Sequence, residues 1–175
     1  SFYRHLCDLI FESIRGCSMS RQEAARRFRF TNLELVNAYH AKKQSLSILG
    51  AHSANWEWVA LSFPLVTPFQ TYGIFQPISS GFLDRVMKAS RERHGMKLID
   101  KKAVGTTLEA EKGNLITMGY IADQSPARTG HNHWVKFMGL DTAVTTGFEH
   151  FARKYRTPVL YLSVKKIRRG YFEAT

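Results

Sequence analysis

The stretch Leu46-Ser-Ile-Leu-Gly-Ala-His-Ser-Ala-Asn-Trp-Glu57 decides the fold of this chain. Its first four residues are a short apolar run bounded by Gly50, which predicts a buried strand. From Asn55 to Leu65 the sequence is rich in Trp and Leu and predicts a helix. His52 therefore lies where a strand passes into a helix, which is the repeating step of an α/β layer fold.

The same alternation continues along the rest of the chain. Strands are expected at 71–75, 96–99, 115–121 and 158–164, and helices at 80–93, 104–112 and 146–156, with a polar loop at 122–133. Strands that alternate with helices indicate an α/β class. We expect a central, mostly parallel or mixed sheet that is flanked by helices.

The first 45 residues differ, because they are predicted to be helical throughout. Apolar residues lie roughly along one helical face up to Gly16 (Phe2, Leu6, Leu9, Phe11 and Ile14). Capping-box patterns at 20–23 and 31–34 predict further helices at 21–28 and 32–43. A single domain over 1–175 is expected, with a helical section at 1–45 and an α/β core at 46–175. The chain opens inside a helix and ends inside a strand, which indicates a fragment of a longer protein.

Composition narrows the class of protein. Apolar residues make up 44% and charged residues 22% of the chain, as in globular domains. The net charge of +11 favours a polyanionic partner: nucleic acid, an anionic membrane, or an acidic protein or substrate. Cys7 and Cys17 are expected to be free thiols. Since the sequence has no run of eighteen apolar residues, no membrane span is predicted.

His52 and Glu57 are the first candidates for chemistry. On one continuous helix a spacing of five residues separates two side chains by about 140°, so they would not touch. If His52 instead precedes the helix, Glu57 can reach back and hold one ring nitrogen, leaving the other to accept a proton. The plain alternative is a capping His and a surface Glu.

A second cluster follows the strand predicted at 115–121. Asp123, Gln124 and Arg128 stand at its carboxyl end, where α/β sheets place ligands, and they are suited to bind a polar head group. An ordinary turn built on Asp and Pro is the alternative. His131 and His133 form a possible metal pair, but no third ligand is evident. Basic runs at 85–102 and 165–169 are typical of solvated surfaces.

Several blocks taken in order resemble one known family. The string Gly50-Ala-His-Ser-Ala-Asn-Trp-Glu57 resembles the H-x4-D/E block of the late lipid A acyltransferases, the lauroyl and myristoyl transferases of the lysophospholipid acyltransferase superfamily. Further matching blocks are Ile74-Phe-Gln-Pro-Ile78, Leu83-Asp-Arg85, Arg91-Glu-Arg-His-Gly95, Ile121-Ala-Asp-Gln-Ser-Pro126, Phe137-Met-Gly139 and the segment 145–159. The resemblance covers roughly residues 45–170.

The resemblance implies a glycerol-3-phosphate acyltransferase-like fold and an O-acyltransferase activity without a cofactor or metal. The donor would be a fatty acyl thioester on acyl carrier protein, and the acceptor a hydroxyl of a lipid A precursor. His52 would be the general base and Glu57 its partner, while Asn55, Gln76, Arg91, Asp123, Gln124 and Arg128 would contact substrate. The family implies a site at the cytoplasmic face of the bacterial inner membrane, with an anchor outside this chain and an anionic membrane surface as a further partner.

Two positions depart from the family pattern. Ala54 stands where members usually have Gly, and Gln76 stands where they usually have an Arg linked to a phosphate or polar head group. Gln76 donates hydrogen bonds without a charge, so Arg91 or Arg128 would have to supply it. A related acyltransferase acting on lysophospholipid, glycerol phosphate or an aminolipid is therefore an alternative. A basic nucleic-acid-binding module is the non-enzymatic alternative, although no binding motif supports it and no nucleic acid is expected.

Overall fold

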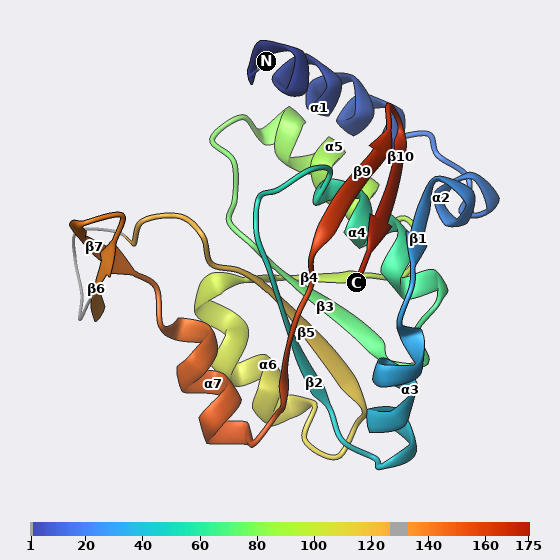
Figure 1. The fold of residues 1–175 in the computed structure, drawn as a ribbon. Helices are drawn as coiled ribbons and strands as arrows, with labels where there is room; N and C mark the ends of the chain where they lie inside the picture. The colour runs from blue at the N-terminus through green and yellow to red at the C-terminus, as the bar shows by residue number, and fades with distance from the viewer. Residues whose placement is uncertain (1, 127–132) are drawn as a thin grey trace.

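The computed structural model describes residues 2–126 and 133–175, and its centre is a five-stranded sheet (Figure 1). The strand order is β4-β3-β5-β2-β8, and all four neighbouring pairs are parallel. The strands are β2 (Leu46–Gly50), β3 (Gln70–Phe75), β4 (Lys97–Asp100), β5 (Ile116–Ile121) and β8 (Val159–Tyr161). The predicted α/β class with a parallel sheet is confirmed.

Helices cover both faces of this sheet. The helices of the described residues are α1 (Phe2–Gly16), α2 (Arg21–Arg27), α3 (Leu33–Ala41), α4 (Glu57–Ser62), α5 (Gly81–Glu92), α6 (Val104–Ala110) and α7 (Gly147–Tyr155), with short 3-10 turns at Phe63–Leu65 and Lys101–Ala103. Of these, α1 and α2 pack on α4 rather than on this sheet. Ile116, Met118 and Tyr120 alternate along β5 and pack beneath α6 and α7. Leu46 and Ile48 of β2 pack on the other face, with Val36 of α3.

A second, smaller sheet was not predicted from the sequence. It has the order β1-β10-β9, from β1 (Phe28–Phe30), β10 (Tyr171–Ala174) and β9 (Val164–Arg168). β1 lies parallel to β10, and this pairing draws the helical section onto the end of the chain. Phe28 stacks on Phe172 there, and Trp58 of α4 lies edge-on to Phe172, in a core separate from that of the main sheet.

The two predicted capping boxes have different outcomes. Both predicted helices form, as α2 and α3. Ser20 accepts a hydrogen bond from the Glu23 backbone N–H at 3.2 Å, while the Glu23 carboxylate binds Arg15 and Arg27. At the second pattern the cap itself is absent, because α3 begins after Asn32 without any side-chain cap. The Thr31 hydroxyl instead lies 2.7 Å from the Thr175 hydroxyl, so it makes a hydrogen bond at the end of the small sheet.

A two-stranded hairpin stands out from the body beside α7 (Figure 1). It joins β6 (His133–Phe137) to β7 (Leu140–Val144) through Met138 and Gly139, whose φ angles of 51° and 82° are those of a tight hairpin turn. This hairpin was not predicted; only the polar loop expected at 122–133 precedes it. Within the described ranges, no helix has the length and apolar character needed to cross a membrane.

Candidate active site

The ends of β2 and β5 bring together two residues that are 71 positions apart. These strands are parallel neighbours in register, with Gly50 paired to Ile121 at their carboxyl ends. His52 and Asp123 each lie two residues beyond that pair. The two side chains therefore meet at the edge where parallel sheets place their ligands.

Asp123 holds His52 through both of its carboxylate oxygens. Oδ1 lies 2.7 Å from Nδ1 of the ring, and Oδ2 accepts the His52 backbone N–H at 2.9 Å. Burial works to raise the Asp123 pKa, but these hydrogen bonds outweigh it and hold the pKa below its usual range. The ionised carboxylate fixes the tautomer with its proton on Nδ1, so Nε2 is the free proton acceptor.

Glu57 does not make the contact predicted for it. It is the first residue of α4, and its carboxylate turns toward α5, where Arg91 donates to it from Nε at 2.8 Å and from Nη2 at 2.7 Å. Among the described residues, no hydrogen bond or ion pair joins Glu57 to His52. His52 does precede the helix, as expected, but its carboxylate partner comes from a neighbouring strand.

Trp56 lies between the His52–Asp123 pair and the Glu57–Arg91 pair. Its ring lies edge-on to the His52 imidazole, with centroids 4.8 Å apart, and the Arg91 guanidinium lies 5.5 Å from its centroid. Arg91 also lies 5.8 Å from the Phe75 ring at the end of β3. The order across the site is therefore Asp123, His52, Trp56, Arg91 and Glu57. Glu57 is therefore separated from His52 by the Arg91 guanidinium and the Trp56 ring.

The turn between His52 and α4 is built on Ala54 and Asn55. Ala54 has φ 49°, a left-handed conformation that favours Gly, which accounts for the residue expected there. Asn55 is fully buried, and its amide donates to Glu12 of α1 at 2.8 Å while its carbonyl oxygen accepts the Trp58 N–H. This burial does not agree with the predicted contact to substrate, because both ends of the amide are used to secure α4.

The other predicted binding residues surround the same edge. Gln76 follows β3 and Gln124 follows Asp123, and both are exposed. Arg91 is largely buried against Glu57, which neutralises the charge that it was expected to offer an acceptor. Arg128 and His131 lie outside the described residues. Sequence reasoning did not select Lys88, whose ammonium lies 4.5 Å from the Phe75 ring centroid and pairs with Asp84 at 3.0 Å.

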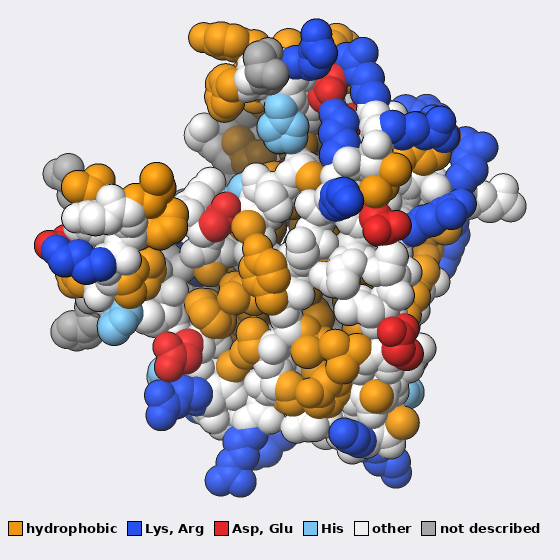
Figure 2. Space-filling view, viewed as in Figure 1, with side chains coloured by type: hydrophobic (Ala, Val, Ile, Leu, Met, Phe, Trp, Pro, Cys, Tyr) orange, Lys and Arg blue, Asp and Glu red, His pale blue; other side chains and the backbone are white. Residues whose placement is uncertain are grey.

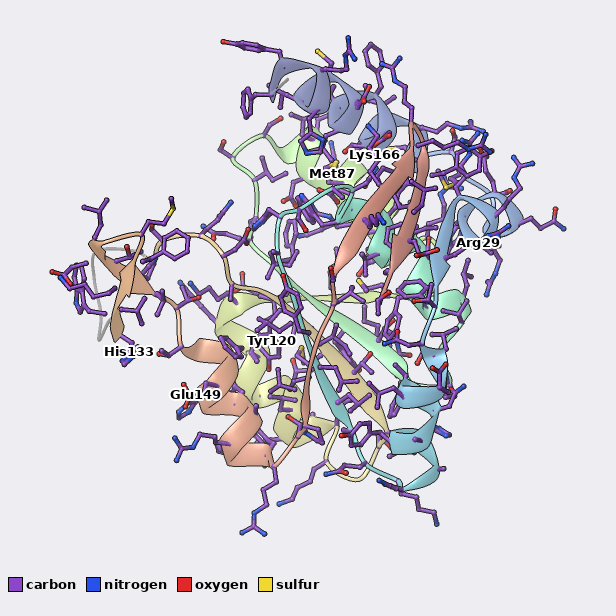
Figure 3. The ribbon with its side chains drawn as sticks, viewed as in Figure 1. Arg29, Met87, Tyr120, His133, Glu149 and Lys166 are labelled. Atoms are coloured by element: carbon purple, nitrogen blue, oxygen red, sulfur yellow. The ribbon has the colours of Figure 1, made fainter. Side chains whose placement is uncertain are left out.

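A pocket of about 350 Å³ opens beside Asp123. Its walls come from the ends of β2, β5 and β8, the last residues of β7 and the start of α7. Apolar lining residues are Leu49, Val144, Phe148 and Tyr161, and polar ones include Asp123, His133 and Glu149. His133 and Glu149 lie on the same side of the molecule (Figure 3). The pocket is open and mostly apolar, and it adjoins Asp123, the hydrogen-bond partner of His52.

The chemistry of the site is that of a His–carboxylate pair. Within residues 2–126 and 133–175, no group of three or more His, Cys, Asp or Glu side chains is placed to hold a metal ion. The two cysteines are free, and in the part of the chain that the structure describes no hydrogen bond joins either of them to His52. The arrangement can remove a proton from a bound hydroxyl or water and return it to a leaving group.

Comparison with known protein families identifies the family of the chain. The model of the bacterial lipid A biosynthesis acyltransferase family matches residues 2–173, nearly the whole chain. A comparison with curated proteins finds no match. The chain belongs to the bacterial lipid A biosynthesis acyltransferase family, and it is an acyltransferase.

Proposed function

We propose that this acyltransferase moves a fatty acyl group from an acyl carrier protein thioester to a hydroxyl of a lipid A precursor, with His52 as the general base. The observation that carries the proposal is the two-point contact of Asp123 with His52, beside an apolar pocket. Family membership supplies the reaction class and a lipid acceptor. The donor, the base and the membrane location are our inferences.

His52 makes the acceptor hydroxyl a competent nucleophile. Nε2 takes the proton as the hydroxyl oxygen attacks the thioester carbonyl, and Asp123 stabilises the imidazolium that forms. The tetrahedral intermediate then collapses, the carbon–sulfur bond breaks, and the imidazolium returns the proton to the departing thiolate. The products are the acyl ester and the free thiol of the carrier. This route needs no covalent acyl-enzyme.

The pocket beside Asp123 is the proposed site of the donor acyl chain. Its apolar walls remove methylene groups from water, which contributes about 0.8 kcal/mol for each group buried. Because Leu49 lies on β2 just before Gly50 and His52, a chain in this pocket would bring its thioester carbonyl close to the base. The depth of the pocket would then set the preferred chain length.

The basic surface is the proposed contact for the acidic carrier protein. Lys and Arg side chains gather where α2, β9 and β10 lie (Figure 2). Exposed members are Arg21, Arg26, Arg29, Lys165 and Arg168. Opposite charge accelerates encounter and selects partners, more than it adds affinity. We place the enzyme at the cytoplasmic face of the bacterial inner membrane, where both its carrier and its lipid acceptor would be available.

Gln76 favours an alternative acceptor with fewer phosphate groups. It is exposed beside the site and is uncharged where family members usually have Arg, and Arg91 is already neutralised by Glu57. A less phosphorylated acceptor, such as an aminolipid, fits this edge better than glycerol phosphate does. Panels of lipid acceptors offered with acyl carrier protein or coenzyme A donors would separate the two.

The direct test measures product by mass. Purified protein, acyl carrier protein charged with a fatty acid, and detergent-dispersed lipid A precursor should yield a lipid heavier by one acyl group. His52→Ala should reduce the rate by about 10²–10⁴-fold, while His150→Ala, an exposed histidine on α7, should leave it unchanged. Activity of His52→Ala within a few-fold of wild type would rule out His52 as the base.

The carrier surface has its own test. Arg26→Glu with Arg29→Glu should raise KM for the acyl carrier protein donor and leave KM for an acyl coenzyme A donor unchanged, if the enzyme accepts it. Lys101→Glu with Lys102→Glu, an equal charge change between β4 and α6, is the control. Equal effects of the two charge reversals would contradict a specific docking surface.

A further inference from the structure

Helix α1 turns its acidic side toward the protein body and its apolar side outward, opposite to an ordinary surface helix. Its two acidic residues face the protein body, where Asp8 is 4% and Glu12 9% exposed. They are four residues apart, so they lie on one stripe of the helix. Charged residues usually occupy the solvent side of such a helix. Here the stripe that contains Asp8 and Glu12 packs against the protein body, and the rest of the helix surface faces outward.

Specific partners fix this orientation. Asp8 accepts hydrogen bonds from Lys166 and from Arg169, each at 2.6 Å. Glu12 accepts from the Asn55 amide at 2.8 Å and from the Gly170 N–H at 3.1 Å. Lys166 is labelled on β9, next to α1 (Figure 3). Turning the helix over would break all four contacts and bury two unpaired carboxylates, so the outward side is set by the fold.

The outward side is strongly apolar. Six large side chains are between 40% and 76% exposed: Phe2, Tyr3, Leu6, Ile10, Phe11 and Ile14. The charged residues exposed on this helix are Arg4 and Arg15, because both acids are turned inward, and Arg15 pairs with Glu23 of α2 at 2.6 Å. A helix with aromatic and aliphatic residues on one side, accompanied only by exposed cations, has the character of an interfacial helix on an anionic bilayer.

The β6–β7 hairpin presents a second apolar surface. Trp134, Phe137, Met138 and Leu140 are between 62% and 87% exposed. A two-stranded hairpin is only marginally stable in water without further packing. Since His133 and Val144 at its base line the pocket beside Asp123, the hairpin joins the site to its apolar tip. Orange side chains are visible over both α1 and the hairpin (Figure 2).

We infer that the outward side of α1 and the tip of the β6–β7 hairpin lie in the headgroup region of an anionic bilayer. This inference rests on the proposed function, because a lipid acceptor must reach the pocket from a membrane. The charge pattern of α1 selects the occupant: the exposed Arg4, on a helix with no exposed acid, matches anionic lipid headgroups. The hairpin would then guide an acceptor from the bilayer surface toward His52.

Vesicle flotation of the chain tests this directly, without any need for activity. Wild type should bind vesicles of phosphatidylethanolamine and phosphatidylglycerol, and bind vesicles of phosphatidylcholine alone more weakly. Ile10→Ser with Ile14→Ser should weaken binding about tenfold or more, since each isoleucine loses its favourable transfer from water. Leu35→Ser with Val159→Ser, two exposed apolar residues on α3 and β8, is the matched control.

Phe137→Ser with Met138→Ser provides an independent variant at the hairpin tip and should also weaken binding. Equal binding by wild type and both variants would overturn the inference. So would a concentration-dependent dimer that the Ile10 and Ile14 changes dissolve, because a second copy would then cover α1. A wild type that binds vesicles but transfers no acyl group would instead show that the proposed function has failed.

Discussion

The Glu57–Arg91 pair allows a test of whether the Glu57 carboxylate stabilises the fold or takes part in catalysis. Glu57→Gln removes the charge and keeps the shape. The bidentate bonds of 2.7 and 2.8 Å join side chains that are only 11% and 17% exposed. Removing one partner of a buried pair leaves the other charge uncompensated, which costs about 3–5 kcal/mol. Because both side chains keep some exposure, we expect the lower end, about 3 kcal/mol.

A double-mutant cycle measures this cost. The variants are Glu57→Gln, Arg91→Met and the two combined, each unfolded by urea at neutral pH and followed by circular dichroism. The combined variant should lose less free energy of unfolding than the two single variants lose in sum, because neither Glu57 nor Arg91 is left as a buried charge without its partner. Asp141→Asn, which breaks the exposed pair with Lys136, should cost less than about 1 kcal/mol. A coupling energy below about 0.5 kcal/mol would refute the reasoning.

Two further predictions concern other parts of the chain. The Lys166 hydrogen bond holds the pKa of Asp8 below its usual range, although burial opposes it. The ionised Asp8 therefore stabilises the folded state above the ordinary pKa of about 3.9, and this stabilisation is lost as pH falls through the lower pKa of the folded state. Urea midpoints of wild type and Asp8→Asn should differ at pH 7 and converge in strong acid, and a constant difference would contradict this. Gln76→Arg should lower KM for a phosphorylated acceptor several-fold and leave KM for the acyl donor unchanged; an unchanged acceptor KM would place residue 76 away from the headgroup.

Much of the main sheet follows from local patterns in the sequence. Each of its five strands was expected within one to three residues, because buried parallel strands are short apolar runs with clear boundaries. The small sheet was missed for the opposite reason. β1 is three residues long and is stabilised by β10, whose paired residues are 144 positions away. Neither segment has a period that predicts this pairing. The hairpin turn is Met-Gly rather than the Asn-Gly that signals such turns.

The candidate site shows the same division between local and distant information. His52 and Asp123 were both selected, each because a strand ends just before it. Their pairing was missed, since the spacing from His52 to Glu57 offered a nearer carboxylate. A signal was present: His52 stands three residues beyond the strand predicted at 46–49, and Asp123 stands two residues beyond the strand predicted at 115–121. If those strands are parallel neighbours in register, their side chains must meet, but strand order cannot be read from either segment alone.

The measurement that tests this account most directly is the kcat of Asp123→Asn beside that of Glu57→Gln, for acyl transfer by purified, folded enzyme. Asn cannot stabilise the imidazolium, so Asp123→Asn should lower kcat by about 10²–10⁴-fold, and Asp123→Glu should recover part of the loss. Glu57→Gln should lose mainly stability and retain more activity than Asp123→Asn. Near-normal kcat for Asp123→Asn, together with a folded but inactive Glu57→Gln, would contradict Asp123 as the partner of His52.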